Sequence, residues 1–327
     1  MKQLKNYPMS RQVYDFSNAL IRCHAIYYVV TPGKEKTPKQ KYEDLQSLIK
    51  EEREKYDAMG ERLQGMANGV KKAAKISQLE TELKQLEPLR HINPISTQAK
   101  SYLKRLYGEL KYGKYSVGKE KGNKYVNKGK LAENDSLELI SMLDGIEFKK
   151  NEIRVENEFL SGIPDTFTGK DIYHADYIPD VKSSWDWETF SANIGEPLNP
   201  LYWWQQQGYF SLTGASAGEV SYCLVNTPDC IIEEEKYRLA RRMDALTTES
   251  PEYRLAEAML INNMTFDDIP PIERRLKFPV KRDDDAIALI HETVPRCRDY
   301  LFELQEMHLT GYFSDKELPI LETIEEI

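Results

Sequence analysis

Two aspartates and a lysine in the second half of the chain have a spacing that could form a divalent-metal site. Asp165 and Asp180 each follow a proline at the end of a predicted strand, and a turn at 168–169 separates the two strands. Side chains alternate along a strand, so Asp180 and Lys182 share one face while Val181 offers only its backbone carbonyl. Two carboxylates held close together repel each other unless a divalent cation binds them. The pattern therefore predicts a divalent-metal site beside an ammonium group.

The spacing of Asp180 and Lys182 is by itself a weak signal, because 30% of the residues are charged. A surface ion pair is the simpler interpretation of the same spacing at Glu82-x-Lys84, Glu109-x-Lys111, Glu147-x-Lys149 and Glu234-x-Lys236. Flanking features distinguish Asp180-x-Lys182. Glu133 begins a predicted helix upstream, and the four-residue spacing of Gln205 and Tyr209 places both on one face of a helix downstream.

Taken in order, these motifs resemble those of the PD-(D/E)XK nucleases. They are Gly129-Lys-Leu-Ala-Glu133, Pro164-Asp165, Asp180-Val-Lys182 and Gln205-x-x-x-Tyr209. The branch with the greatest likeness is that of the phage-type exonucleases similar to lambda exonuclease and YqaJ, and the last motif is also similar to the RecB nuclease domain. Ile21-Arg-Cys-His-Ala, followed by Thr31-Pro32, is similar to a segment near the start of such phage proteins. The resemblance covers roughly residues 10–34 and 95–305.

The resemblance implies a role for each motif residue. Lys182 is implied to orient or deprotonate the attacking water, or to neutralise charge on the phosphate, and Gln205 and Tyr209 to position the metal site or the DNA backbone. A metal bound there polarises the phosphate and lowers the pKa of a bound water. The implied ligands of one or two Mg²⁺ or Mn²⁺ ions are Glu133, Asp165, Asp180 and the Val181 carbonyl.

Predicted helices and strands, which must position these residues, alternate from about residue 127 onward. This alternation favours the α/β class. The resemblance implies a restriction-endonuclease-like core, with a mixed central sheet flanked by helices. A mixed helical stretch at 10–30 precedes the core. Predicted helices span 131–143, 201–212, 233–246 and 283–307, with a short helix and loop in 250–270. Predicted strands span 146–149, 153–159, 163–167, 172–182, 220–225 and 274–280.

Residues 35–92 have a different composition, which is rich in Glu, Lys, Gln and Leu. Apolar residues recur at helical spacing at Leu45, Leu48, Tyr56, Met59, Leu63 and Met66, and at coiled-coil spacing at Ile76, Leu79, Leu83 and Leu86. With a break at Asn68-Gly69, the pattern predicts an inserted α-helical coiled-coil hairpin, either structural or oligomeric or in contact with DNA or a partner. The predicted domains are 1–34, the N-terminal part of the nuclease; 35–92, the hairpin; 93–307, the nuclease core; and 308–327, an acidic tail.

A basic segment lies at 100–130, with ten Lys or Arg against two Glu in a chain of net charge −8. Five tyrosines are interleaved, so the segment could neutralise phosphates and stack bases, although a solvated helix face is the simpler alternative. The predicted DNA-binding residues are Lys100, Lys104, Arg105, Lys111, Lys114, Lys124 and Lys128.

Composition and motifs exclude several other classes. No apolar run approaches the length of a transmembrane helix, and the first residues lack a signal-peptide pattern, which together predict a cytoplasmic protein. The four cysteines and five histidines lack metal-site spacing, and there is no phosphate-binding loop motif of nucleotide hydrolases.

The function predicted from the resemblance is a metal-dependent DNA exonuclease of phage or prophage recombination or DNA end processing. The resemblance also implies an oligomer such as a ring-like trimer and a single-strand annealing protein as partner. Two alternatives stay open: a structure-specific or restriction-type endonuclease using the same site, and a catalytically idle DNA-binding scaffold in which the hairpin and the basic segment act.

Overall fold

A computed structural model describes residues 13–32, 36–89, 95–115, 124–245 and 247–310. The chain divides into two compact units, one formed by residues 1–27 with 103–327 and the other by residues 28–102. In the described ranges, no helix is both long enough and apolar enough to cross a membrane.

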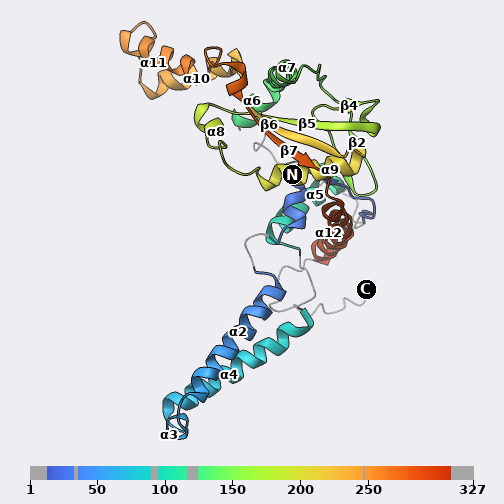
Figure 1. The fold of residues 1–327 in the computed structure, drawn as a ribbon, viewed down its shortest axis with the longest axis vertical. Coiled ribbons are helices and arrows are strands. Elements are labelled where there is room, and N and C mark those ends of the chain that lie inside the picture. Colours follow the sequence, from blue (N-terminus) through green and yellow to red (C-terminus); the bar gives the residue numbers. More distant parts are fainter. Residues whose placement is uncertain (1–12, 33–35, 90–94, 116–123, 246, 311–327) are drawn as a thin grey trace, which may run out of the picture. The chain divides into compact units, whose positions relative to one another are not determined.

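A four-stranded mixed sheet forms the centre of the larger unit, in the order β4-β5-β6-β7 (Figure 1). Strand β5 runs antiparallel to β4 and parallel to β6, and β7 runs antiparallel to β6. A parallel pair needs a crossover connection, and helices α8 and α9 provide it between β5 and β6. The bounds are β4 (Thr168–Gly169), β5 (Ala175–Ser183), β6 (Ala217–Cys223), β7 (Arg275–Lys281), α8 (Trp187–Ser191) and α9 (Pro200–Thr213).

Helices cover both faces of this sheet. Val181 and Cys223 pack on the apolar side of α7, whereas Asp180 and Lys182 alternate to the other face, toward α9. Figure 1 shows α7 and α9 on opposite sides of β5 and β6. The remaining helices of this unit are α6 (Lys124–Leu131), α7 (Glu133–Asp144), α10 (Asp229–Arg242), α11 (Pro251–Asn262) and α12 (Asp284–Thr310), with 3₁₀ turns η1 (Cys23–Ala25), η3 (Ile172–His174) and η4 (Pro271–Arg274).

A second, small sheet lies beside α9. Strand β3 (Leu160–Gly162) pairs in parallel with β1 (Ile21–Arg22) and antiparallel with β2 (Val155–Glu156). Helix α9 approaches η1 closely at Gly208, where an added Cβ would lie 2.4 Å from Ile26 Cδ1 and 2.9 Å from Cys23 Sγ. A larger residue would require the Ile26 and Cys23 side chains to shift, so the glycine allows the helix that carries Tyr209 to approach η1 closely.

The mixed α/β class is confirmed, and so are the main helices and strands after residue 200. Helices predicted at 201–212, 233–246 and 283–307 are present as α9, α10 and α12, although α10 already begins at Asp229. The strands predicted at 220–225 and 274–280 are β6 and β7.

The predictions for 146–169 are largely wrong. Residues 146–149 and 163–167 form no strand, β2 is far shorter than predicted, and 168–169 is itself a strand rather than the turn. Asn151 explains part of the difference, because its side chain accepts a hydrogen bond from Ile153 N and donates one to the Pro164 carbonyl, replacing ladder bonds with local ones. The helical stretch predicted for 10–30 is helical only from residue 23, and residues 10–12 lie outside the described ranges.

The smaller unit contains a helical hairpin formed by α2 (Pro38–Asp57) and α4 (Ala67–Leu86), with α3 (Glu61–Gln64) between them and η2 (Glu87–Leu89) after them. Thr37 begins α2 with a reciprocal capping box to Gln40. Helices α2 and α4 lie side by side in opposite directions (Figure 1), and Glu52 pairs with Lys75 at 3.3 Å. Helix α1 (Ile26–Val30) and helix α5 (Thr97–Tyr112) belong partly to each unit.

Two details of the predicted hairpin are wrong. Ile49 is buried in place of Leu48, which is 37% exposed, because the buried stripe of α2 follows Tyr42, Leu45 and Ile49. Asn68-Gly69 lies inside the first turn of α4, and the chain reverses at 58–66 instead.

Candidate active site

Asp180 lies in the middle of β5, opposite Val220 of β6, and is only 1% exposed. Lys182 shares its face, and the Lys182 Nζ lies 2.5 Å from Asp180 Oδ2 and 4.8 Å from the centre of the Tyr202 ring on α9. Asp180 Oδ1 has no hydrogen-bond partner among the described residues. A buried carboxylate oxygen without a partner is costly, so this atom is suited to bind a cation.

Asp165 approaches the same strand from a loop. Its Oδ2 accepts a hydrogen bond of 2.9 Å from the Val181 backbone N–H. Asn151 holds the loop in place, since its N–H donates to the Asp165 carbonyl at 2.7 Å and its side-chain amide donates to the Pro164 carbonyl at 2.9 Å. The predicted proximity of Asp165 and Asp180 is therefore present, although a braced loop rather than a strand hairpin produces it.

The electrostatics of the two aspartates and the lysine are coupled. Burial, followed by the charge of Asp180, raises the pKa of Asp165 well above its ordinary value, and Lys182 opposes that rise. Burial acts against the ammonium of Lys182, but the charges of Asp180 and Asp165 outweigh it and raise the pKa of Lys182. Two carboxyl groups and one ammonium group thus crowd together at this site.

Glu133 is the first residue of α7, and its Oε1 lies 3.3 Å from the Lys150 Nζ. Its charge contributes to the raised pKa of Asp165, which places Glu133 within electrostatic reach of the aspartates. In the part of the chain that the structure describes, no three acidic, His or Cys side chains converge as a ready metal cluster. The structure thus brings together Asp165, Asp180 and Lys182, and leaves Glu133 paired with Lys150.

Gln205 and Tyr209 form a hydrogen-bonded pair on α9, as their spacing predicts. Gln205 Nε2 donates to Tyr209 Oη at 2.8 Å, and Tyr209 Oη donates to the Ile163 carbonyl at 3.1 Å. Burial, then the charges of Asp180 and Asp165, raise the pKa of the Tyr209 hydroxyl. This pair braces the backbone that leads into Asp165.

The predicted DNA-binding residues differ in exposure and in their contacts. Lys100, Lys104, Arg105 and Lys114 are exposed. Lys111 donates to Gln305 Oε1 at 2.8 Å, and Lys124 lies 3.6 Å from Glu235 on α10. Lys128 is fully buried and therefore lies outside the predicted surface.

Lys128 is an unusual buried lysine, because its Nζ donates to the Trp185 carbonyl at 2.8 Å and lies 5.2 Å from the centre of the Phe266 ring. Burial lowers the pKa of Lys128 to about 8, only partly opposed by Asp186.

The buried lysine leads to a prediction about stability. Since the unfolded lysine has a pKa of 10.5, the unfolded state binds more protons between pH 8 and 10.5, and stability should rise with pH across that window. We expect Lys128→Met to remove this rise and the exposed Lys130→Met to retain it, measured as thermal midpoints against pH. A rise that persists in Lys128→Met would contradict the prediction.

Asn151 and Tyr202 contribute to the site but were not predicted from the sequence. Tyr202 precedes Gln205 by three residues and thus shares its face of α9, a signal that was available in the sequence. Asn151 could not be found in this way, because its role depends on the distant loop at 163–165.

Comparison with known proteins identifies the fold. A crystal structure of a phage related exonuclease from Haemophilus somnus 129PT matches with a TM-score of 0.55 and 20% identity, over 89% of this chain and 97% of that chain. An alkaline exonuclease (LHK-Exo) from Laribacter hongkongensis, solved also in complex with dAMP, matches with a TM-score of 0.44 and 14% identity, over 66% of this chain and 86% of that chain.

The first likeness shows that the chain shares its fold with a phage related exonuclease, as the motif resemblance predicts. No protein-family model and no curated protein sequence matches the chain.

Proposed function

We propose that this chain is a metal-dependent exonuclease that hydrolyses DNA phosphodiester bonds. The observation that carries the proposal is the buried Asp180 carboxylate, with one oxygen unpartnered among the described residues, beside Asp165 and Lys182. The fold shared with a phage related exonuclease supports the same conclusion. Phage or prophage recombination, or DNA end processing, is the proposed setting.

The residues at the site fit a hard divalent cation, Mg²⁺ or Mn²⁺, because they offer carboxylate and carbonyl oxygens. Asp165, Asp180 and the Val181 carbonyl would hold it, and Glu133 would join them on leaving Lys150. Such a metal, when bound, polarises the scissile phosphate and lowers the pKa of a bound water. The mutual repulsion of Asp165 and Asp180 is the physical cost that binding a cation relieves.

The other residues act through position and charge. Lys182 carries a positive charge 2.5 Å from Asp180 Oδ2, so it can neutralise charge that develops on the phosphate or orient the water. Gln205 and Tyr209 are positioning residues, because they hold the Ile163 carbonyl two residues before Asp165.

Linear and covalently closed circular duplexes of one sequence separate exonuclease from endonuclease action. We expect loss of the linear DNA and persistence of the circle in Mg²⁺. Cleavage of the circle would favour the endonuclease alternative, and binding without any hydrolysis would favour the idle scaffold. The polarity of digestion follows from which labelled end is lost first.

We propose a homo-oligomer, such as a ring-like trimer, acting in the cytoplasm with a single-strand annealing protein. Light scattering of the full chain tests the first of these directly.

A further inference from the structure

We infer that a basic pocket between α6 and α10 binds backbone phosphates of the DNA whose end occupies the proposed nuclease site. The inference rests on the proposed function and adds a second contact for the same substrate. The pocket measures about 490 Å³ and is lined by Lys124, Glu235, Arg238, Arg241 and Arg242.

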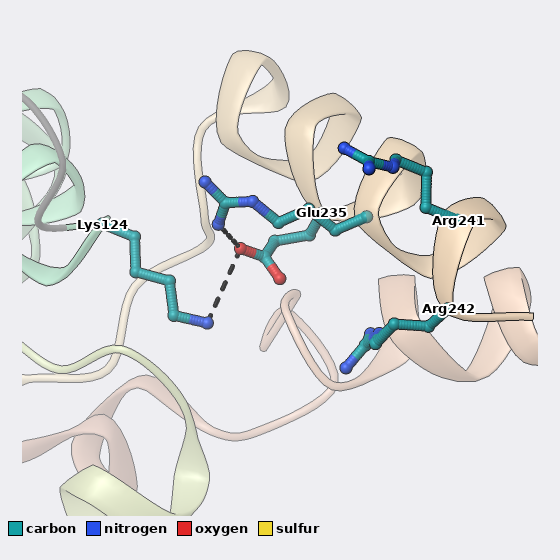
Figure 2. A pocket seen from close by; sticks show the side chains of 5 residues that line it. Lys124, Glu235, Arg241 and Arg242 are labelled. Carbon is teal, nitrogen blue, oxygen red and sulfur yellow. Dashed lines mark hydrogen bonds and ion pairs between the residues drawn. The ribbon is translucent and has the colours of Figure 1, made fainter.

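The pocket has an excess of positive charge in an otherwise acidic chain. Four of its five lining residues are basic, whereas the whole chain has a net charge of −8. Helical spacing explains the clustering, because Glu235, Arg238 and Arg242 are three and four residues apart on α10. Figure 2 shows the side chains of Arg241 and Arg242 extending toward the side of the helix from which Glu235 projects.

One acidic residue organises the pocket without neutralising it. Glu235 is 6% exposed, and both Arg238 and Lys124 pair with it, Lys124 Nζ lying 3.6 Å from its Oε1. Arg241 and Arg242 are exposed, and within the described ranges neither makes an ion pair, although the Arg241 guanidinium lies 6.0 Å from the centre of the Tyr237 ring. Two guanidinium groups, each with several donors in a planar fork, are thus available to an anion, and guanidinium geometry matches phosphate oxygens.

The position of the pocket connects it to the proposed site. The Lys124 Nζ lies 4.5 Å from the centre of the Trp185 ring, and Trp185 follows Lys182 by only three residues. Three residues span at most about 10 Å between their Cα atoms, so Trp185, the aromatic neighbour of Lys124, lies just beyond the end of β5, the strand that carries Asp180 and Lys182. We therefore expect one bound DNA strand to contact both the carboxylates and the pocket.

An aromatic surface beside the pocket fits the same ligand. Tyr125, 55% exposed, meets the Trp185 ring edge to face with ring centres 5.3 Å apart. Cationic groups that track phosphates, next to aromatic rings that contact bases, are the usual combination of nucleic-acid grooves. A free anion alone would not need the aromatic neighbours.

Binding of a labelled linear duplex in EDTA tests the inference without hydrolysis. We expect Arg241→Gln and Arg242→Gln each to weaken binding about tenfold and to reduce the slope of log affinity against log salt by about one. Glu235→Gln should tighten binding, a change opposite in sign to that expected from damage to the fold. Arg254→Gln on α11, whose side chain is 62% exposed and outside the pocket, is the matched control.

Hydrolysis in Mg²⁺ separates this inference from the proposed function. The two arginine variants should raise KM and leave kcat unchanged, since a phosphate contact outside the reacting centre contributes equally to the bound substrate and to the transition state. Wild-type hydrolysis combined with unaltered affinity and salt slope in both variants would overturn the pocket and leave the nuclease intact. Weakened binding in both variants, with no hydrolysis by the wild type, would support the pocket and overturn the nuclease.

Discussion

Lys182→Met should lower kcat for DNA hydrolysis by about 10²–10⁴-fold while divalent-ion binding persists. The reason is that Lys182 supplies the positive charge at the aspartates, 2.5 Å from Asp180 Oδ2, but no oxygen ligand for a metal. Losses of this size are typical of removing a group that stabilises charge or transfers a proton in the transition state. Steady-state rates on linear duplex, together with the rise in thermal midpoint on adding Mn²⁺, measure the two effects separately.

The matched control is Lys149→Met. Glu147 and Lys149 have the same spacing and lie 3.6 Å apart, but their side chains are 81% and 78% exposed. We expect the rate of Lys149→Met to equal that of the wild type. A normal rate in Lys182→Met, with the variant folded, would remove Lys182 from the reaction.

Asp165→Asn should abolish hydrolysis and, in a chelator, make the protein more stable. Burial and the charge of Asp180 raise the pKa of Asp165, so the folded state binds more protons than the unfolded state above the ordinary value of 3.8. The free energy of unfolding must therefore fall as pH rises from 3.8 to the raised pKa. Above the raised pKa, the wild type is destabilised by the full cost of burying the charged carboxylate. A gain of about 1 kcal/mol corresponds to about 2–4 °C in a protein of this size.

Thermal unfolding in EDTA across the acidic to neutral range tests this prediction. Asp165→Asn should have the higher midpoint at neutral pH and a flatter dependence on pH. Asp171→Asn is the control, because a hydrogen bond from His174 lowers the pKa of that exposed carboxyl and its removal should bring no gain. A lower midpoint for Asp165→Asn than for the wild type at neutral pH would contradict the prediction.

The parts of the site that depend on local periodicity could be predicted from sequence. Alternation along β5 places Asp180 and Lys182 together, and helical spacing places Gln205 beside Tyr209. The motif resemblance also anticipated the fold shared with a phage related exonuclease.

The parts that depend on tertiary contacts could not be predicted. Asp165 reaches Asp180 through a loop braced by Asn151, and no local pattern encodes that contact. Burial likewise distinguishes Lys128 from the other lysines of the basic segment, although nothing in the composition of the segment marks it as buried. The arginines of α10 were missed because Arg238, Arg241 and Arg242 look like an ordinary charged helix until Lys124 lies opposite them.

The most direct test of a metal-dependent nuclease site at Asp165 and Asp180 is the decay of end-labelled linear duplex DNA in Mg²⁺ and in EDTA. Wild type and Asp180→Asn should be compared at equal folded concentration. We predict loss of DNA only for the wild type in Mg²⁺, with Asp180→Asn slower by at least about 10³-fold, because a Lewis-acid metal contributes several kcal/mol to the transition state. Equal rates for the two proteins, or undiminished hydrolysis in EDTA, would contradict the assignment of the site.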